Sequence, residues 1–74
     1  MPTTVYFKDF SDNFYKSVVL EGNIFGENAR LQVFMQVNSE WVSLGERVTN
    51  NGIRVGKPLW GVITVKSFYV QNQS

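Results

Sequence analysis

The segment Ala29-Arg30-Leu31-Gln32-Val33-Phe34-Met35-Gln36-Val37 decides the fold class of this chain. Its odd-numbered residues are all apolar, and its even-numbered residues are polar except for Phe34. A period of two is typical of a β-strand with one buried and one solvent-facing side, whereas an amphipathic helix needs spacings of three and four. We therefore predict a strand over residues 29–37, with Phe34 on its polar side.

The segments on both sides of this strand also read as strands and turns. Asn38-Ser39-Glu40 is a turn signal, after which residues 41–44 close a hairpin with residues 29–37. Asn51-Gly52 has the residues of a two-residue type I′ hairpin. Further strands are predicted at residues 3–8, 14–20, 47–50, 53–55 and 62–70, the last with a bulge or with both faces covered. Residues 1–74 are thus expected to form a single all-β domain, a small antiparallel β-sandwich or barrel of about six or seven short strands.

The composition makes an enzyme unexpected. The 74 residues include no cysteine and no histidine, and their formal net charge is +1. These absences remove thiol chemistry, cysteine-containing zinc sites and the commonest general base at neutral pH. The acidic residues fall in predicted turns, and the turn from Asp9 to Asn13 lacks the glycine and the final glutamate of a calcium loop. We expect no catalytic residues, no cofactor and no metal.

A membrane protein is also unexpected from the sequence. No apolar run approaches the roughly 20 residues that a membrane-spanning helix needs. Met1-Pro2-Thr3-Thr4 does not open a signal peptide, because no basic segment leads into an apolar one.

The aromatic content points instead to an interaction role. The chain has two tryptophans, three tyrosines and six phenylalanines. A domain of this size buries only about 60% of the surface of its unfolded chain, and each ring buries roughly 150–250 Å². The domain cannot enclose all of these rings, so we expect some of them to lie at contacts with other molecules. The residues predicted for such a protein interface are Phe34, Leu59, Trp60 and Tyr69.

Two other binding roles compete with a protein interface. A single-stranded nucleic acid could bind a small β-barrel that combines rings with cations. The candidate residues are Arg30, Arg47, Arg54, Lys57 and Lys66 with Phe34, Trp41, Trp60, Phe68 and Tyr69. Six acidic residues against seven basic ones make nucleic acid the less favoured partner. A sugar could instead stack on Trp41 and Trp60.

The order of motifs over residues 15–70 resembles the small β-sandwich structural proteins of tailed bacteriophages. A turn flanked by Gly22 and Gly26 precedes the alternating strand, Trp41-Val42-Ser43-Leu44 follows the next turn, and a closing strand ends the span. Gly56-Lys57-Pro58-Leu59-Trp60-Gly61 departs from the pattern of this group. The resemblance implies a non-enzymatic virion protein, most simply a capsid decoration protein or a fibre or tail accessory protein. It also implies binding to capsid, fibre or tail subunits and to further copies of the chain, and location in the virion.

Overall fold

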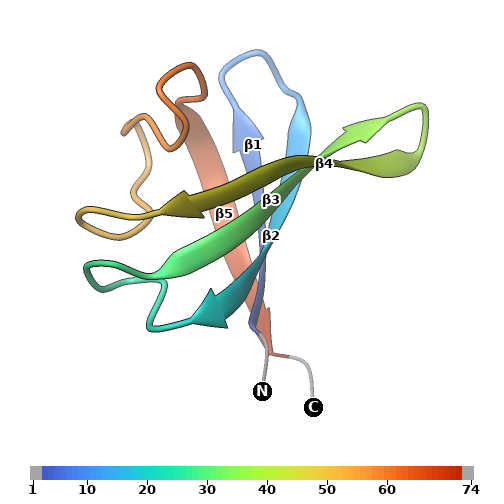
Figure 1. Cartoon of the computed structure of the whole chain (residues 1–74). Helices are drawn as coiled ribbons and strands as arrows, with labels where there is room; N and C mark the ends of the chain where they lie inside the picture. Colours follow the sequence, from blue (N-terminus) through green and yellow to red (C-terminus); the bar gives the residue numbers. More distant parts are fainter. Residues whose placement is uncertain (1–2, 73–74) are drawn as a thin grey trace.

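The computed structural model describes residues 3–72. Met1 and Pro2, which begin the segment considered above for a signal peptide, lie outside this range. Within this range the chain forms five strands and no helix, and hence no helix that could cross a membrane. The strands are β1 (Thr3–Asp9), β2 (Phe14–Glu21), β3 (Arg30–Val37), β4 (Glu40–Val48) and β5 (Val65–Asn72). They build one antiparallel sheet with the order β4-β3-β2-β1-β5 (Figure 1). The all-β prediction is confirmed, whereas a sandwich or barrel of six or seven strands is not.

The β3–β4 hairpin follows the sequence prediction closely. Val37 pairs with Glu40, and Asn38 and Ser39 between them have φ values of 50° and 67°. A type I′ turn requires positive φ at both central residues, which asparagine tolerates better than most residues. Leu31 and Val33 of β3 are fully buried, as their alternation predicts.

Three bulges interrupt the pairing and bend the sheet. The extra residues are Leu20 in β2, Leu44 in β4 and Lys66 in β5. A bulge increases the local twist and shifts the side chains beyond it to the opposite face. Trp41 and Ser43 consequently share the face of Phe34, while Gly45 and Arg47 pair with the buried residues Val33 and Leu31. The bulge in β5 confirms one of the two alternatives predicted for residues 62–70.

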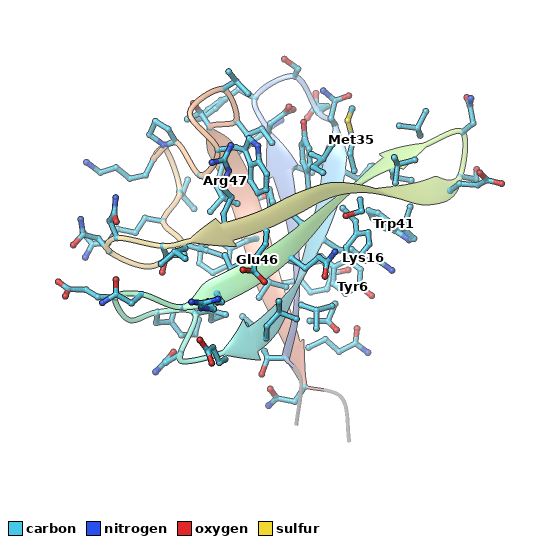
Figure 2. All side chains as sticks on the ribbon, in the orientation of Figure 1. Tyr6, Lys16, Met35, Trp41, Glu46 and Arg47 are labelled. Carbon is cyan, nitrogen blue, oxygen red and sulfur yellow. The ribbon has the colours of Figure 1, made fainter. Side chains whose placement is uncertain are left out.

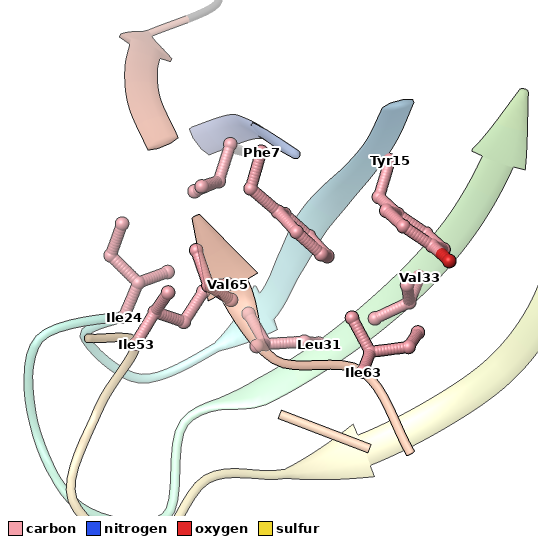
Figure 3. Packing of buried hydrophobic residues seen from close by; sticks show 9 residues of the cluster. Phe7, Tyr15, Ile24, Leu31, Val33, Ile53, Ile63 and Val65 are labelled. Carbon is pink, nitrogen blue, oxygen red and sulfur yellow. The ribbon is translucent and has the colours of Figure 1, made fainter. Parts of the chain in front are cut away.

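The core lies on one side of the bent sheet and is completed by loops. Strand residues Val5, Phe7, Tyr15, Leu31, Val33 and Val65 meet Ile24, Ile53 and Ile63, which come from the loops on either side of the β3–β4 hairpin (Figure 3). We call this side of the sheet the core face and the opposite side the outer face. Between β4 and β5 the described residues form no strand pairing, and the loop of residues 49–64 supplies the covering side chains there.

The region after Gly45 differs from its prediction. The strand predicted over residues 41–44 does not end there, because β4 continues through the bulge to Val48. Asn51-Gly52 does not form a two-residue hairpin, and residues 53–55 are not a strand. Instead, the Ile53 amide donates to the carbonyl oxygen of Ile24 (3.2 Å), which ties this loop to the one before β3. A distant backbone contact therefore replaces the local turn that the two residues favour.

Candidate binding face

The eleven rings divide unequally between the interior and the surface. Only Phe7 and Tyr15 are buried, stacked with ring centroids 5.1 Å apart. Four other rings are largely exposed, and the remaining five are half-buried. The exposed rings belong to Phe10, Phe14, Phe25 and Tyr69. The expectation that the fold leaves aromatic surface uncovered is met by this single chain.

Five of the nine rings that are not buried lie on the outer face. Tyr6 of β1 is paired with Tyr69 of β5, and their rings stack with centroids 4.9 Å apart and planes 12° apart. Trp41 of β4 meets Tyr6 edge-on, with centroids 6.3 Å apart. Trp41 and Tyr6 come from strands separated by β2 and β3, so the contact between their rings spans the middle of the sheet.

Two lysines lie among these rings. The Lys16 ammonium is 4.8 Å from the centroid of Trp41 and 5.5 Å from that of Phe34, and Figure 2 shows Lys16 beside Trp41 and Tyr6. The Lys8 ammonium is 4.2 Å from the centroid of Phe14, its partner on β2. Such distances are those of cation–π contacts. In residues 3–72 neither lysine forms an ion pair, whereas Arg30 binds Glu21 and Glu46, and Lys66 binds Asp12.

We call this surface the aromatic face, and it consists of Tyr6, Lys8, Phe14, Lys16, Phe34, Trp41 and Tyr69. The outer-face residues that border it include seven uncharged ones, namely Thr4, Val18, Gln32, Gln36, Ser43, Ser67 and Gln71. Glu46, the partner of Gln32, is also on this face and is bound to Arg30. A hollow of about 120 Å³ opens between Tyr6, Lys8, Phe14 and Tyr69. The face thus offers flat rings and two cations, with no carboxylate between them.

The structure separates the predicted interface residues into two groups. Phe34 and Tyr69 belong to the aromatic face. Leu59 and Trp60 lie in the loop of residues 49–64 and are half-buried against the core. Trp60 packs near Gly45. The guanidinium carbon of Arg47, a residue on the core-face side of β4, is 4.2 Å from the centroid of the Trp60 ring.

The wider residue sets weighed for nucleic acid and sugar are also divided. Phe68 faces the core and contacts Phe25, so it is not on the aromatic face. Trp41 and Trp60 lie on different sides of β4 and do not form one sugar platform. Sequence reasoning missed Tyr6, Lys8, Phe14 and Lys16, although they alternate with the buried residues Val5, Phe7, Tyr15 and Ser17. That alternation is the signal that could have found them.

The turn from Asp9 to Asn13, which lacks the pattern of a calcium loop, is closed by its own hydrogen bonds. The Asp9 carboxylate accepts from the amides of Ser11 and Asn13 (2.9 Å each), from Asn13 Nδ2 (3.1 Å) and from the Tyr15 hydroxyl (3.1 Å). Desolvation raises the pKa of Asp9, but these bonds outweigh it and hold the pKa below its usual value. Burial and the nearby Asp9 raise the pKa of Tyr15. No cluster of three potential metal ligands of the Asp, Glu, His or Cys type occurs in residues 3–72.

Comparisons with known proteins add no further assignment. No protein-family model, curated protein or solved structure matches the chain.

Proposed function

We propose that this chain is a non-enzymatic binding protein and that its aromatic face binds single-stranded nucleic acid. The observation that carries the proposal is the contact of Lys16 with the Trp41 and Phe34 rings beside the Tyr6–Tyr69 stack. Single strands bind proteins through bases stacked on aromatic rings and phosphates held by nearby cations. Both elements lie here on one face of a sheet.

The ring arrangement favours unpaired bases over a duplex. Base faces are accessible to protein rings only where the bases are not already stacked in a helix. Tyr69 is 60% exposed and Phe14 is 49% exposed, so both rings retain free surface. The hollow between them, lined also by Tyr6 and Lys8, gives a flat base an apolar seat with a cation at its edge.

The local charge favours this partner even though the whole chain is almost neutral. From the sequence alone, nucleic acid is the less favoured partner because the chain has nearly equal numbers of acidic and basic residues. The acidic residues of the outer face, Glu21 and Glu46, both bind Arg30, and Asp12 binds Lys66. Lys8 and Lys16 therefore remain available for phosphates. If both lysines contact phosphates of a single strand, a plot of the logarithm of the association constant against the logarithm of the salt concentration should have a slope of about −1.4.

A fluorescence titration tests the proposal. In the Trp60→Phe variant Trp41 is the remaining tryptophan. An unlabelled oligothymidylate should quench the fluorescence of Trp41 as it binds. Lys16→Gln should weaken binding and make the salt slope less negative by about 0.7. Lys66→Gln is the matched control, because that ammonium is bound to Asp12, and it should leave the slope unchanged. Absence of quenching at low salt would exclude the proposal.

A second candidate, assembly with other virion proteins, follows from the resemblance to bacteriophage structural proteins and is favoured by a separate apolar surface. Phe25 is 59% exposed and lies 6.2 Å from the ring of Phe68, next to the exposed Val70. Exposed contiguous apolar side chains are typical of protein contacts. In this proposal the chain oligomerises, lies in the virion and contacts capsid, fibre or tail subunits.

The solution mass of the purified chain and its co-sedimentation with capsids test this second candidate. Phe25→Ala should reduce assembly while oligonucleotide binding stays unchanged. If Phe34→Ala or Tyr69→Ala reduces assembly instead, the aromatic face is the protein interface. A monomer that does not sediment with capsids would contradict the virion role.

A further inference from the structure

A second surface feature lies far along β4 from Trp41, in the loop of residues 49–64. A hollow of about 260 Å³ is lined by residues 48–52, Arg54 and residues 57–59. It contains two cationic side chains and no acidic one. This volume is below the roughly 300–1,000 Å³ of pockets for drug-sized ligands, so the hollow suits a small group.

The charges of this hollow are not neutralised within the described chain. Arg54 and Lys57 form no ion pair in residues 3–72, in contrast to Arg30 and Lys66. All six acidic residues occur at or before Glu46. The charged residues in the segment that lines the hollow are therefore all basic. Two uncompensated cations in one concavity favour an anion.

Backbone donors add to the side-chain charge. The N–H groups of Asn50, Asn51 and Gly52 donate no hydrogen bond to another residue in the described part of the chain. Successive free N–H groups are a common way for proteins to bind phosphate oxygens. The side-chain amides of the lining residues Asn50 and Asn51 are further potential donors.

The walls of the hollow are held in place before any ligand binds. On one side, the carbonyl oxygen of Thr49 accepts from the Asn28 amide (2.7 Å), and the Thr49 amide donates to Ala29 (3.0 Å). On the other, buried Ile53 bonds to Ile24, and the Lys57 amide donates to Arg54 (3.3 Å). A preorganised site loses less conformational freedom on binding than a flexible loop does.

We propose that this hollow binds a phosphate group, held by Arg54, Lys57 and the free backbone amides of residues 50–52. The group could be a free phosphate monoester or part of a nucleic-acid backbone. The site does not use the aromatic face, so it stands whether or not that face binds single strands.

Amide-resolved NMR with inorganic phosphate at constant ionic strength tests the proposal. Phosphate should shift the amide signals of Asn50, Asn51 and Gly52 in a saturable manner. Arg54→Gln should raise the Kd about tenfold, the effect of losing one hydrogen bond to a charged group. Lys66→Gln, which alters a cation already bound to Asp12, should leave the Kd unchanged. No saturable shift by about 10 mM, ten times a Kd of 1 mM, would overturn the proposal.

An oligothymidylate without terminal phosphates distinguishes the two sources. If it shifts the same amides together with those around Trp41, the hollow holds the backbone of a bound strand. If inorganic phosphate shifts them and the oligonucleotide does not, the hollow takes a free phosphate group. Equal shifts with phosphate and with chloride would contradict a phosphate site, because they would report non-specific screening.

Discussion

Tyr6 and Tyr69 face each other across the β1–β5 pairing, and their rings stack at 4.9 Å on the outer face of the sheet. Neither ring is needed to fill the core, which lies on the opposite side around Phe7 and Val65. A stacked pair on a solvent-facing surface keeps apolar area accessible to a partner. The pair thus joins the fold to its proposed function, because the pairing register of two strands sets the position of the platform.

The exposed half of this pair should contribute strongly to binding and weakly to stability. Tyr69→Ala should reduce affinity for a single-stranded oligonucleotide about 5- to 150-fold, since stacking of one base is worth about 1–3 kcal/mol. The lost Tyr6 contact should cost about 1 kcal/mol of stability. Fluorescence titration and urea unfolding measure the two effects. Phe10→Ala is the control, because Phe10 is 63% exposed and contacts no other ring in residues 3–72; an equal loss there would contradict a specific role for Tyr69.

Local sequence patterns predicted the first half of the fold well. β1, β2 and β3 begin and end within a residue or two of their predicted positions, because each alternates buried and exposed side chains. The same patterns placed Phe34 on the outer face. They could not show that Tyr6 meets Trp41, because that contact depends on the pairing of four strands and on the bend of the sheet.

The second half was harder to predict because distant contacts override local preferences. The bulge at Leu44 merges two predicted strands into β4 and reverses which side chains face the core. Asn51-Gly52 has the local chemistry of a hairpin, yet Ile53 is held by the backbone of Ile24. The sequence predicts Leu59 and Trp60 at an interface with another chain. In this structure they are half-buried and cover the core beside β4.

Gly52 should be the least replaceable glycine in the long loop. Its φ is +77°, and an added Cβ would lie 2.8 Å from the carbonyl oxygen of Phe25. Gly56 has a similar φ of +80° but nothing within 4 Å of the added atom, so Gly56→Ala should cost only the backbone strain, about 1–2 kcal/mol. We expect Gly52→Ala to cost at least about 1 kcal/mol more, because the collision adds to the strain. Urea unfolding of both variants measures the difference, and equal losses would show that the Phe25 contact is unimportant.

Ser17 should be a site where truncation increases stability. Its side chain is fully buried between Val5 and Val33, and its hydroxyl has no hydrogen-bond partner in residues 3–72. An unsatisfied buried polar group costs about 1–3 kcal/mol, so Ser17→Ala should raise the free energy of unfolding by about 1 kcal/mol. In a domain of this size that is a rise of about 4–8 °C in Tm. Exposed Ser67→Ala should change Tm little, and a fall in Tm for Ser17→Ala would mean that the hydroxyl is bonded in solution.

Asp9 should make the domain sensitive to acid. Because its pKa is lower in the folded chain than the ordinary 3.8, its contribution to stability is present above that value and is lost as the pH falls through the folded pKa. The free energy of unfolding should therefore decrease between about pH 5 and about pH 2, and less steeply in Asp9→Asn. Tyr15→Phe removes one donor to the carboxylate and should move its pKa upward, as carboxyl NMR can follow. Glu27→Gln changes an exposed carboxyl group that forms no ion pair in residues 3–72 and serves as the control. An unchanged pH dependence in Asp9→Asn would show that other carboxyl groups govern acid unfolding.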